Sequence, residues 1–276
     1  MKLVQFNDYR LGVAEDDSVY DITGYLPNGE AQWGPIRMVR LVEGFDQVRD
    51  RLADDLSAHR LSPAKVERYL PPLTRPDKVV GAPVNYNVHR QSYPDVDKYT
   101  IKASGWFLKA PSAIVGPSDA IRIPREGVVN YEGELCLVIG KTASDVSAAD
   151  AMPYIFGYTA MLDLTFKNSD GRSTRKSWDT FAPAGPCIVT ADEIADPQNL
   201  GVHVWIDGEL VQDYCTDDMI FPIPELIEFT SGRMALLPGD LFTTGNGGPS
   251  GALKDGQTVK VAIDGIGEMS LPVRYR

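Results

Sequence analysis

Turn-forming residues divide residues 78–276 into short, mostly apolar runs of strand length. The chain holds 25 glycines and 20 prolines, a composition that favours many turns and short strands over long helices. The pattern lacks regular strand–helix alternation, which argues against a doubly wound parallel sheet. We therefore predict a mostly β (α+β) fold. The predicted strands cover residues 78–80, 105–109, 113–115, 134–139, 187–190, 202–206, 241–244 and 259–263.

Helices are predicted at only two places in this part of the chain. One covers residues 148–154, where Ser147 can cap the first turn. The other covers residues 223–231, where proline suits the first turn. A hairpin is expected to turn at Asp207 and Gly208, because an Asp-Gly pair favours the tight turns of hairpins.

The start of the chain is predicted to form a separate, small β domain. Two strand-like runs and a third strand after a turn open this segment, and apolar spacing predicts a helix over residues 36–53. Ser62 and the proline after it favour a second helix over residues 63–69. The proline-rich segment 70–78 cannot continue a helix, so we place the domain boundary there. The two predicted domains are residues 1–72 and 73–276.

Charge and composition restrict the partners of the chain. Its 276 residues carry a formal net charge of −11, which disfavours binding to nucleic acid or to an anionic membrane. The sequence lacks an apolar run of about 20 residues that could span a membrane, and its first residues do not resemble a signal peptide. Three cysteines without CxxC spacing fit a reduced compartment, so we expect a cytoplasmic protein.

Paired carboxylates give the strongest local signal for chemistry. Glu132 and Glu134 lie two residues apart at the start of a very apolar strand, so their side chains project from the same face. Two such carboxylates repel unless a cation or a proton joins them, and a hard divalent ion is one solution. Asp163, after a long apolar run, is a third candidate ligand. The alternative is a solvated strand end for the glutamates and a capping role for the aspartate.

A histidine and three lysines are further candidates. His89, in a polar loop, could act as a base near neutral pH, or it could simply be exposed. Lys109, Lys167 and Lys176 could attract an anionic substrate, although lysines are usually solvated. The glycine-rich loop 245–251 lacks the motif of a phosphate-binding loop, but its backbone N–H groups could approach a small anion.

Several of these segments together resemble the fumarylacetoacetate hydrolase family over roughly residues 75–276. The stretches that carry the resemblance are NYNVH (85–89), FLKAPSAIVGP (107–117), YEGELCLVIGK (131–141), FGYTAMLD (156–163), KSWDTFAPAGP (176–186), DGELVQD (207–213), MIFPIPELI (219–227) and LLPGDLFTTG (236–245). The resemblance implies a rolled, mostly β catalytic domain, a smaller N-terminal β domain and a homodimer.

The same resemblance implies roles for particular residues. Mg²⁺ or Mn²⁺, with Ca²⁺ as a substitute, would be bound at Glu132, Glu134 and Asp163. His89 would be the general base, assisted by Lys109 and Lys176. The residues expected to contact substrate are Tyr86, Lys167, Gly245 and Asn246.

Three departures from the family pattern affect these roles. Ser92 stands where a glutamate usually orients the base, and Asp95 or Asp97 could substitute for it. Lys167 replaces an arginine and loses the planar fork that pairs with a carboxylate, a loss that Arg172 or Arg175 could offset. In the glycine-rich loop, Asn246 and Gly247 stand where the family commonly has Thr-Pro after Thr-Gly, and the Asn246 side chain can still form hydrogen bonds.

The preferred hypothesis is a metal-dependent hydrolase that cleaves a carbon–carbon bond in a small 2,4-dioxo acid, such as an acylpyruvate, in aromatic catabolism. A decarboxylase, isomerase or hydratase of a 2-oxo acid could use the same enolate intermediate. A non-catalytic binding protein with the same fold is the remaining alternative.

Overall fold

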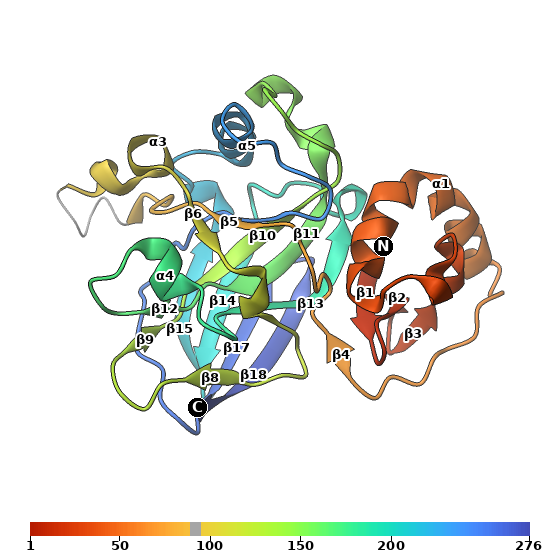
Figure 1. The fold of residues 1–276 in the computed structure, drawn as a ribbon, viewed down its shortest axis with the longest axis horizontal. Coiled ribbons are helices and arrows are strands. Elements are labelled where there is room, and N and C mark those ends of the chain that lie inside the picture. The colour runs from red at the N-terminus through yellow and green to blue at the C-terminus, as the bar shows by residue number, and fades with distance from the viewer. Residues whose placement is uncertain (89–94) are drawn as a thin grey trace.

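A computed structural model describes residues 1–88 and 95–276 (Figure 1). In this part of the chain the α-helices are α1 (Arg37–Ser57), α3 (Ile101–Ser104), α4 (Arg172–Lys176) and α5 (Ile223–Ser231). The strands are β1 (Lys2–Phe6), β2 (Arg10–Glu15), β3 (Ser18–Asp21), β4 (Tyr69–Leu70), β5 (Val79–Gly81), β6 (Phe107–Lys109), β7 (Ile114–Val115), β8 (Ile121–Ile123), β9 (Val129–Asn130), β10 (Gly133–Ile139), β11 (Ile155–Leu162), β12 (Thr165–Phe166), β13 (Ala182–Thr190), β14 (Gly201–Ile206), β15 (Glu209–Cys215), β16 (Leu241–Thr243), β17 (Thr258–Ile263) and β18 (Gly267–Tyr275). The mostly β fold is therefore confirmed.

The larger sheet runs through the whole molecule in the order β3-β2-β1-β13-β11-β10-β16-β5-β6. Every residue of β10 is buried, because β11 and β16 pair with its two edges and other elements cover its two faces. This explains why β10 reads as a continuous apolar run rather than an alternating one. Among the described residues the sheet is open, since the path does not return to its first strand.

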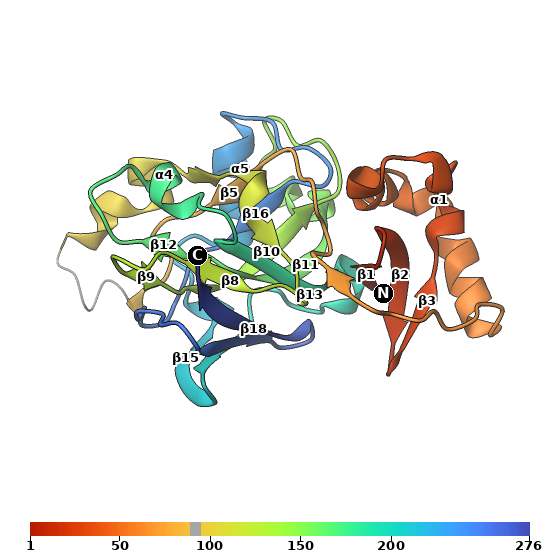
Figure 2. The same ribbon diagram turned by 60° about the horizontal axis from the view of Figure 1, so that its bottom comes forward.

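A second, open sheet has the order β15-β14-β17-β18-β8 and packs against the first (Figure 2). Its buried residues Val204 and Val261 contribute to the main hydrophobic core. Gly133, on the strand that carries the two glutamates, faces this second sheet. A Cβ atom at that position would overlap the Cγ2 atom of Val204, so only glycine allows the sheets to lie this close.

The N-terminal segment lies at one end of the molecule in both ribbon views (Figures 1 and 2). Helix α1 packs its apolar face on β1–β3 and contributes to a second buried cluster of apolar side chains. Strand β1 pairs with β13 through Lys2–Val189 and Leu3–Ile188. Residues 1–72 thus share a sheet with the rest of the chain, and their division into a separate domain stays a prediction.

Two of the predicted helices are wrong. Residues 63–69 form no helix, because Ala64 donates a backbone hydrogen bond to Val19 at 2.7 Å and the chain extends along the edge of β3. Residues 148–154 form two short 3₁₀ turns, because Pro153 cannot continue an α-helix. The helices at α1 and α5 and the turn at Asp207 and Gly208 are confirmed, the turn by positive φ angles of 53° and 88°. None of the helices in the described part is long and apolar enough to cross a membrane.

Candidate active site

The three predicted acidic residues converge at the ends of two paired strands. Glu134 lies on β10, Glu132 directly precedes that strand, and Asp163 directly follows β11. Antiparallel pairing of Gly133 with Leu162 brings the two strand ends together, and the Asp163 N–H donates to the Glu132 carbonyl oxygen at 2.7 Å. One carboxylate oxygen from each side chain lies within 4.8 Å of the other two.

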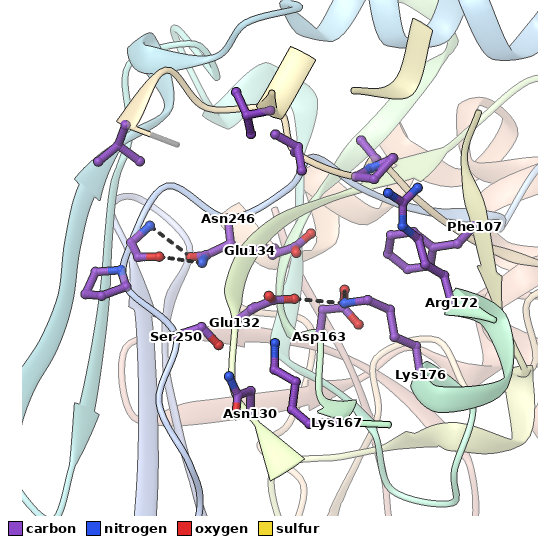
Figure 3. Close-up of a pocket in the computed structure, with 17 residues that line it drawn as sticks. Phe107, Asn130, Glu132, Glu134, Asp163, Lys167, Arg172, Lys176, Asn246 and Ser250 are labelled. Carbon is purple, nitrogen blue, oxygen red and sulfur yellow. Dashed lines mark hydrogen bonds and ion pairs between the residues drawn. The ribbon is translucent and has the colours of Figure 1, made fainter. Parts of the chain in front are cut away.

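Two lysines neutralise part of this acidic cluster. The Lys109 ammonium, at the end of β6, donates to Asp163 Oδ1 at 2.5 Å and to the Leu164 carbonyl oxygen at 3.3 Å. The Lys176 ammonium, at the end of α4, pairs with the other oxygen of Asp163 and with Glu132 Oε2, the latter at 2.8 Å (Figure 3). Both lysines are buried, so neither is the usual solvated surface lysine.

Burial and neighbouring charges shift the pKa values of two of the acids and of Lys176. Burial and the neighbouring Asp163 carboxylate raise the pKa of Glu134 to about 8. Burial would also raise the pKa of Asp163, but Lys109 and Lys176 outweigh it and hold that pKa below its usual range. Burial opposes the charge of Lys176, yet the adjacent Asp163 and Glu132 carboxylates raise its pKa overall. The metal-free cluster therefore holds a proton on Glu134 near neutral pH.

A cavity of about 520 Å³ opens above the carboxylates. Phe107 and several small apolar residues line it beside the acids and Lys176. Its remaining polar side chains are Asn130, Lys167, Arg172, Asn246 and Ser250 (Figure 3). Its volume lies in the range of about 300–1,000 Å³ that is typical of small-molecule sites.

The glycine-rich loop closes one side of the cluster. The Gly245 N–H donates to Glu134 Oε2 at 2.9 Å, and the positive φ of 93° at Gly245 favours glycine there. The buried Asn246 side chain donates to the Gly248 carbonyl oxygen at 2.7 Å and accepts from the Gly248 N–H at 3.1 Å. This loop thus fixes both a carboxylate and a pocket-lining amide.

Two residues of β15 support the site, and the sequence reasoning missed both. Gln212 accepts from the Gly133 N–H at 3.0 Å and donates to the Pro249 carbonyl oxygen at 2.6 Å. Tyr214 donates from its hydroxyl to the Gly133 carbonyl oxygen at 2.5 Å. The available signal was the spacing of two in Val-Gln-Asp-Tyr, which puts an amide and a phenol on one face of a strand.

The structure places the other predicted residues as follows. Tyr86 is completely buried and packs edge to face on Tyr214, with ring centroids 5.0 Å apart, so it lies under the site rather than on the cavity wall. Lys167 lines the cavity but is exposed. Asp95 is in an exposed ion pair with Lys98 at 3.0 Å. The predicted base, His89, and Ser92 lie outside the described residues.

Comparisons with known proteins give the family of the chain. Residues 78–274 match the family model for the fumarylacetoacetate hydrolase C-terminal domain. Maleylpyruvate hydrolase of Aquipseudomonas alcaligenes is 34% identical over 291 residues, covering 99% of each chain. The mitochondrial oxaloacetate tautomerase fahd2 of Xenopus laevis is 36% identical over 300 residues, covering 99% of this chain and 90% of its own.

Solved structures also match over the full length of this chain. Maleylpyruvate hydrolase from Sphingobium sp. SYK-6 matches with a TM-score of 0.90 at 34% identity, over 100% of both chains. The same enzyme in complex with manganese(II) and pyruvate matches with a TM-score of 0.89 at 34% identity, over 100% of this chain and 99% of that one. Fold, buried acidic cluster and relatives together define the chain as an enzyme. It belongs to the fumarylacetoacetate hydrolase family.

Proposed function

We propose that the enzyme hydrolyses a carbon–carbon bond of a small 2,4-dioxo acid of the acylpyruvate type. The observation that carries this proposal is the convergence of Glu132, Glu134 and Asp163 within 4.8 Å at the floor of the cavity. Relatives that span the whole chain support it, since one is a maleylpyruvate hydrolase and a solved maleylpyruvate hydrolase is in complex with manganese(II) and pyruvate.

The donor set fits a hard divalent ion such as Mn²⁺ or Mg²⁺. All three groups offer carboxylate oxygens, which these ions prefer. The cluster holds one more carboxylate than the two ammonium groups can balance, and burial together with the neighbouring Asp163 carboxylate raises the pKa of Glu134. A bound divalent ion would polarise the 2-oxo acid end of the substrate and orient it.

The residues around the acids have complementary tasks in this proposal. Lys109 and Lys176 hold Asp163 and Glu132 in place, while the Gly245 N–H orients Glu134. Lys176 also lies over the Phe107 ring, 4.8 Å from its centroid, so its charge stays close to the cavity. Lys167 and Asn246 lie on the cavity wall and carry N–H groups that can donate to polar oxygens of the substrate.

The reaction consumes one molecule of water. Its hydroxyl joins the distal carbonyl carbon, the bond between that carbon and the methylene group breaks, and the electron pair of the bond remains with the pyruvate fragment. A proton then completes the pyruvate methyl group, so a carboxylic acid and pyruvate leave. His89 stays our proposed base for deprotonating the water.

Several finer statements belong to the same proposal. Family membership supports Mg²⁺ as an alternative ion, a homodimeric state and a role in the breakdown of aromatic compounds. The three cysteines without CxxC spacing support a cytoplasmic location.

A tautomerase is the second candidate function. The fahd2 relative, an oxaloacetate tautomerase, favours it. Such a reaction moves one proton between carbon and oxygen of a 2-oxo acid and needs no attack by water. The same acidic cluster and lysines would serve both reactions.

A substrate assay distinguishes the two functions. Acetylpyruvate and maleylpyruvate are incubated with the enzyme plus Mn²⁺, plus Mg²⁺, or plus chelator, and pyruvate release is measured with lactate dehydrogenase. We expect pyruvate from at least one of these substrates with metal and none with chelator. Tautomerisation of oxaloacetate without pyruvate release from either acylpyruvate would favour the second function. Undiminished activity in chelator would contradict both.

A further inference from the structure

The cavity wall carries two cations that do not belong to the acidic cluster. Lys109 and Lys176 already pair with Asp163 and Glu132. Arg172 and Lys167 also line the cavity, and neither forms an ion pair with a carboxylate within residues 1–88 and 95–276. These two cations therefore have no partner in the acidic cluster.

Arg172 is held in a defined position. It begins α4, and its Nη1 donates to Ser104 Oγ on α3 at 2.9 Å. The rest of α4 is fixed to β6, because Ser173 accepts from the Leu108 N–H at 3.2 Å and Ser177 accepts from the Ala110 N–H at 2.9 Å. In Figure 3 the guanidinium group lies beside Phe107, on the side of the acids away from Lys167.

Arg172 suits a carboxylate better than Lys167 does. Arg172 is half-buried, whereas Lys167 is exposed, and water screens an exposed charge. The planar guanidinium can also bind both oxygens of a carboxylate, which an ammonium group cannot do. Arg175, three residues along the same helix, does not line the cavity.

A count of charges indicates what the extra cations bind. With all three carboxylates ionised, the acidic cluster and its two lysines carry one net negative charge, and a divalent ion would change this to one net positive charge. The single carboxylate of a 2-oxo acid would neutralise that charge. A substrate without a second anionic group would then leave Arg172 in the cavity with no counter-charge.

We infer that Arg172 binds a second carboxylate at the distal end of the substrate, so that the enzyme selects 2-oxo dicarboxylates over 2-oxo monocarboxylates. This inference rests on the proposed function, because it takes the 2-oxo acid end to lie at the acidic cluster. Arg172 is then the residue that determines specificity, and Ser104 positions it.

Binding of matched acids tests this inference without turnover. The Mn²⁺-loaded protein is titrated calorimetrically with 2-oxoglutarate and 2-oxopentanoate, and with 2-oxoadipate and 2-oxohexanoate, pairs in which a methyl group replaces the distal carboxylate. A charged hydrogen-bonded pair predicts roughly tenfold to hundredfold tighter binding of the dicarboxylate in at least one pair. The Arg172→Gln variant should lose this preference, and Arg172→Lys should restore only part of it.

Arg175→Gln is the matched control, since it removes the same charge from the same helix outside the cavity. It should keep the preference of the natural protein. Three results would overturn the inference and leave the proposed function intact. The first is equal binding of the two acids within both pairs. The others are a preference for the dicarboxylate that survives in Arg172→Gln, or one that disappears equally in Arg175→Gln. If none of the four acids binds, the proposed function fails and the inference fails with it.

Discussion

Lys109 and Asp163 form a completely buried ion pair, with Nζ of the lysine 2.5 Å from Oδ1 of the aspartate. The two residues are 54 positions apart in the chain, and each side chain is at most 1% exposed. Lys176 pairs with the other oxygen of Asp163, so this one carboxylate is bound from both sides. The pairing makes Asp163 a fixed, ionised member of the acidic cluster.

Removal of the buried ammonium group should cost the fold much of its stability. Lys109→Met leaves the buried Asp163 side chain with one cationic partner, Lys176. We expect the free energy of unfolding to fall by about 3–5 kcal/mol, the usual cost of leaving one charge of a buried pair uncompensated. Urea unfolding of the metal-free protein measures this. Lys98→Met, at an exposed ion pair, is the control and should change stability by less than about 1 kcal/mol; an equal effect in both variants would contradict the structure.

Metal affinity should depend on pH through Glu134. Its pKa of about 8 means that the folded, metal-free protein holds a proton there at neutral pH, and a metal ion must displace that proton. Affinity for Mn²⁺ should therefore rise by about tenfold per pH unit up to pH 8 and level off above it. Titrations between pH 6 and 9 measure this dependence, and an affinity independent of pH below 8 would contradict it.

The same shift predicts how the stability of the metal-free protein varies with pH. A carboxyl whose pKa is raised on folding stabilises the folded state most at low pH. That contribution is lost as pH rises from the ordinary range of a glutamate toward about 8. We expect the stabilisation by added Mn²⁺ in thermal unfolding to increase as pH rises over the same interval. If this stabilisation instead increased as pH falls, the predicted direction of the pKa shift of Glu134 would be wrong.

Gly133 should not tolerate even one methyl group. Its Cβ would overlap Val204 on the second sheet, so Gly133→Ala should lower the free energy of unfolding by about 1–3 kcal/mol and displace the two flanking glutamates. Gly44→Ala is the matched control, because Gly44 lies in α1 with open space around it. That change should stabilise the protein by about 0.5–1 kcal/mol. Chemical unfolding measures whether the free energy of unfolding falls in Gly133→Ala and rises in Gly44→Ala. An unchanged free energy of unfolding in Gly133→Ala would contradict the close packing of the sheets.

The sequence predicted the parts of the site that depend on local spacing. Glu132 and Glu134 lie two residues apart on a strand, and Asp163 ends an apolar run, so each could be identified without knowledge of the fold. Their convergence depends on the pairing of β10 with β11, a long-range contact that the residues themselves do not specify. Only the family resemblance brought Lys109 and Lys176 to the same place.

The features that sequence reasoning missed depend on packing between distant segments. Gln212 and Tyr214 reach the backbone of Gly133 because the second sheet lies against the first. The choice between Arg172 and Arg175 also required the structure, since both arginines have the same charge and neighbourhood in the sequence. The predicted helix over residues 63–69 failed for the same kind of reason, because an edge contact with β3 outweighed its capping signal.

Titration of Mn²⁺ followed by electron paramagnetic resonance tests the central claim, that one divalent ion binds at the three carboxylates. At pH 8 the natural protein should bind one Mn²⁺ per chain, and Glu126→Gln, which alters an exposed glutamate, should bind equally well. Glu134→Gln should bind roughly a hundredfold more weakly or not at all, because the neutral amide removes one of three anionic ligands. Equal affinity of the natural protein and Glu134→Gln would contradict the account.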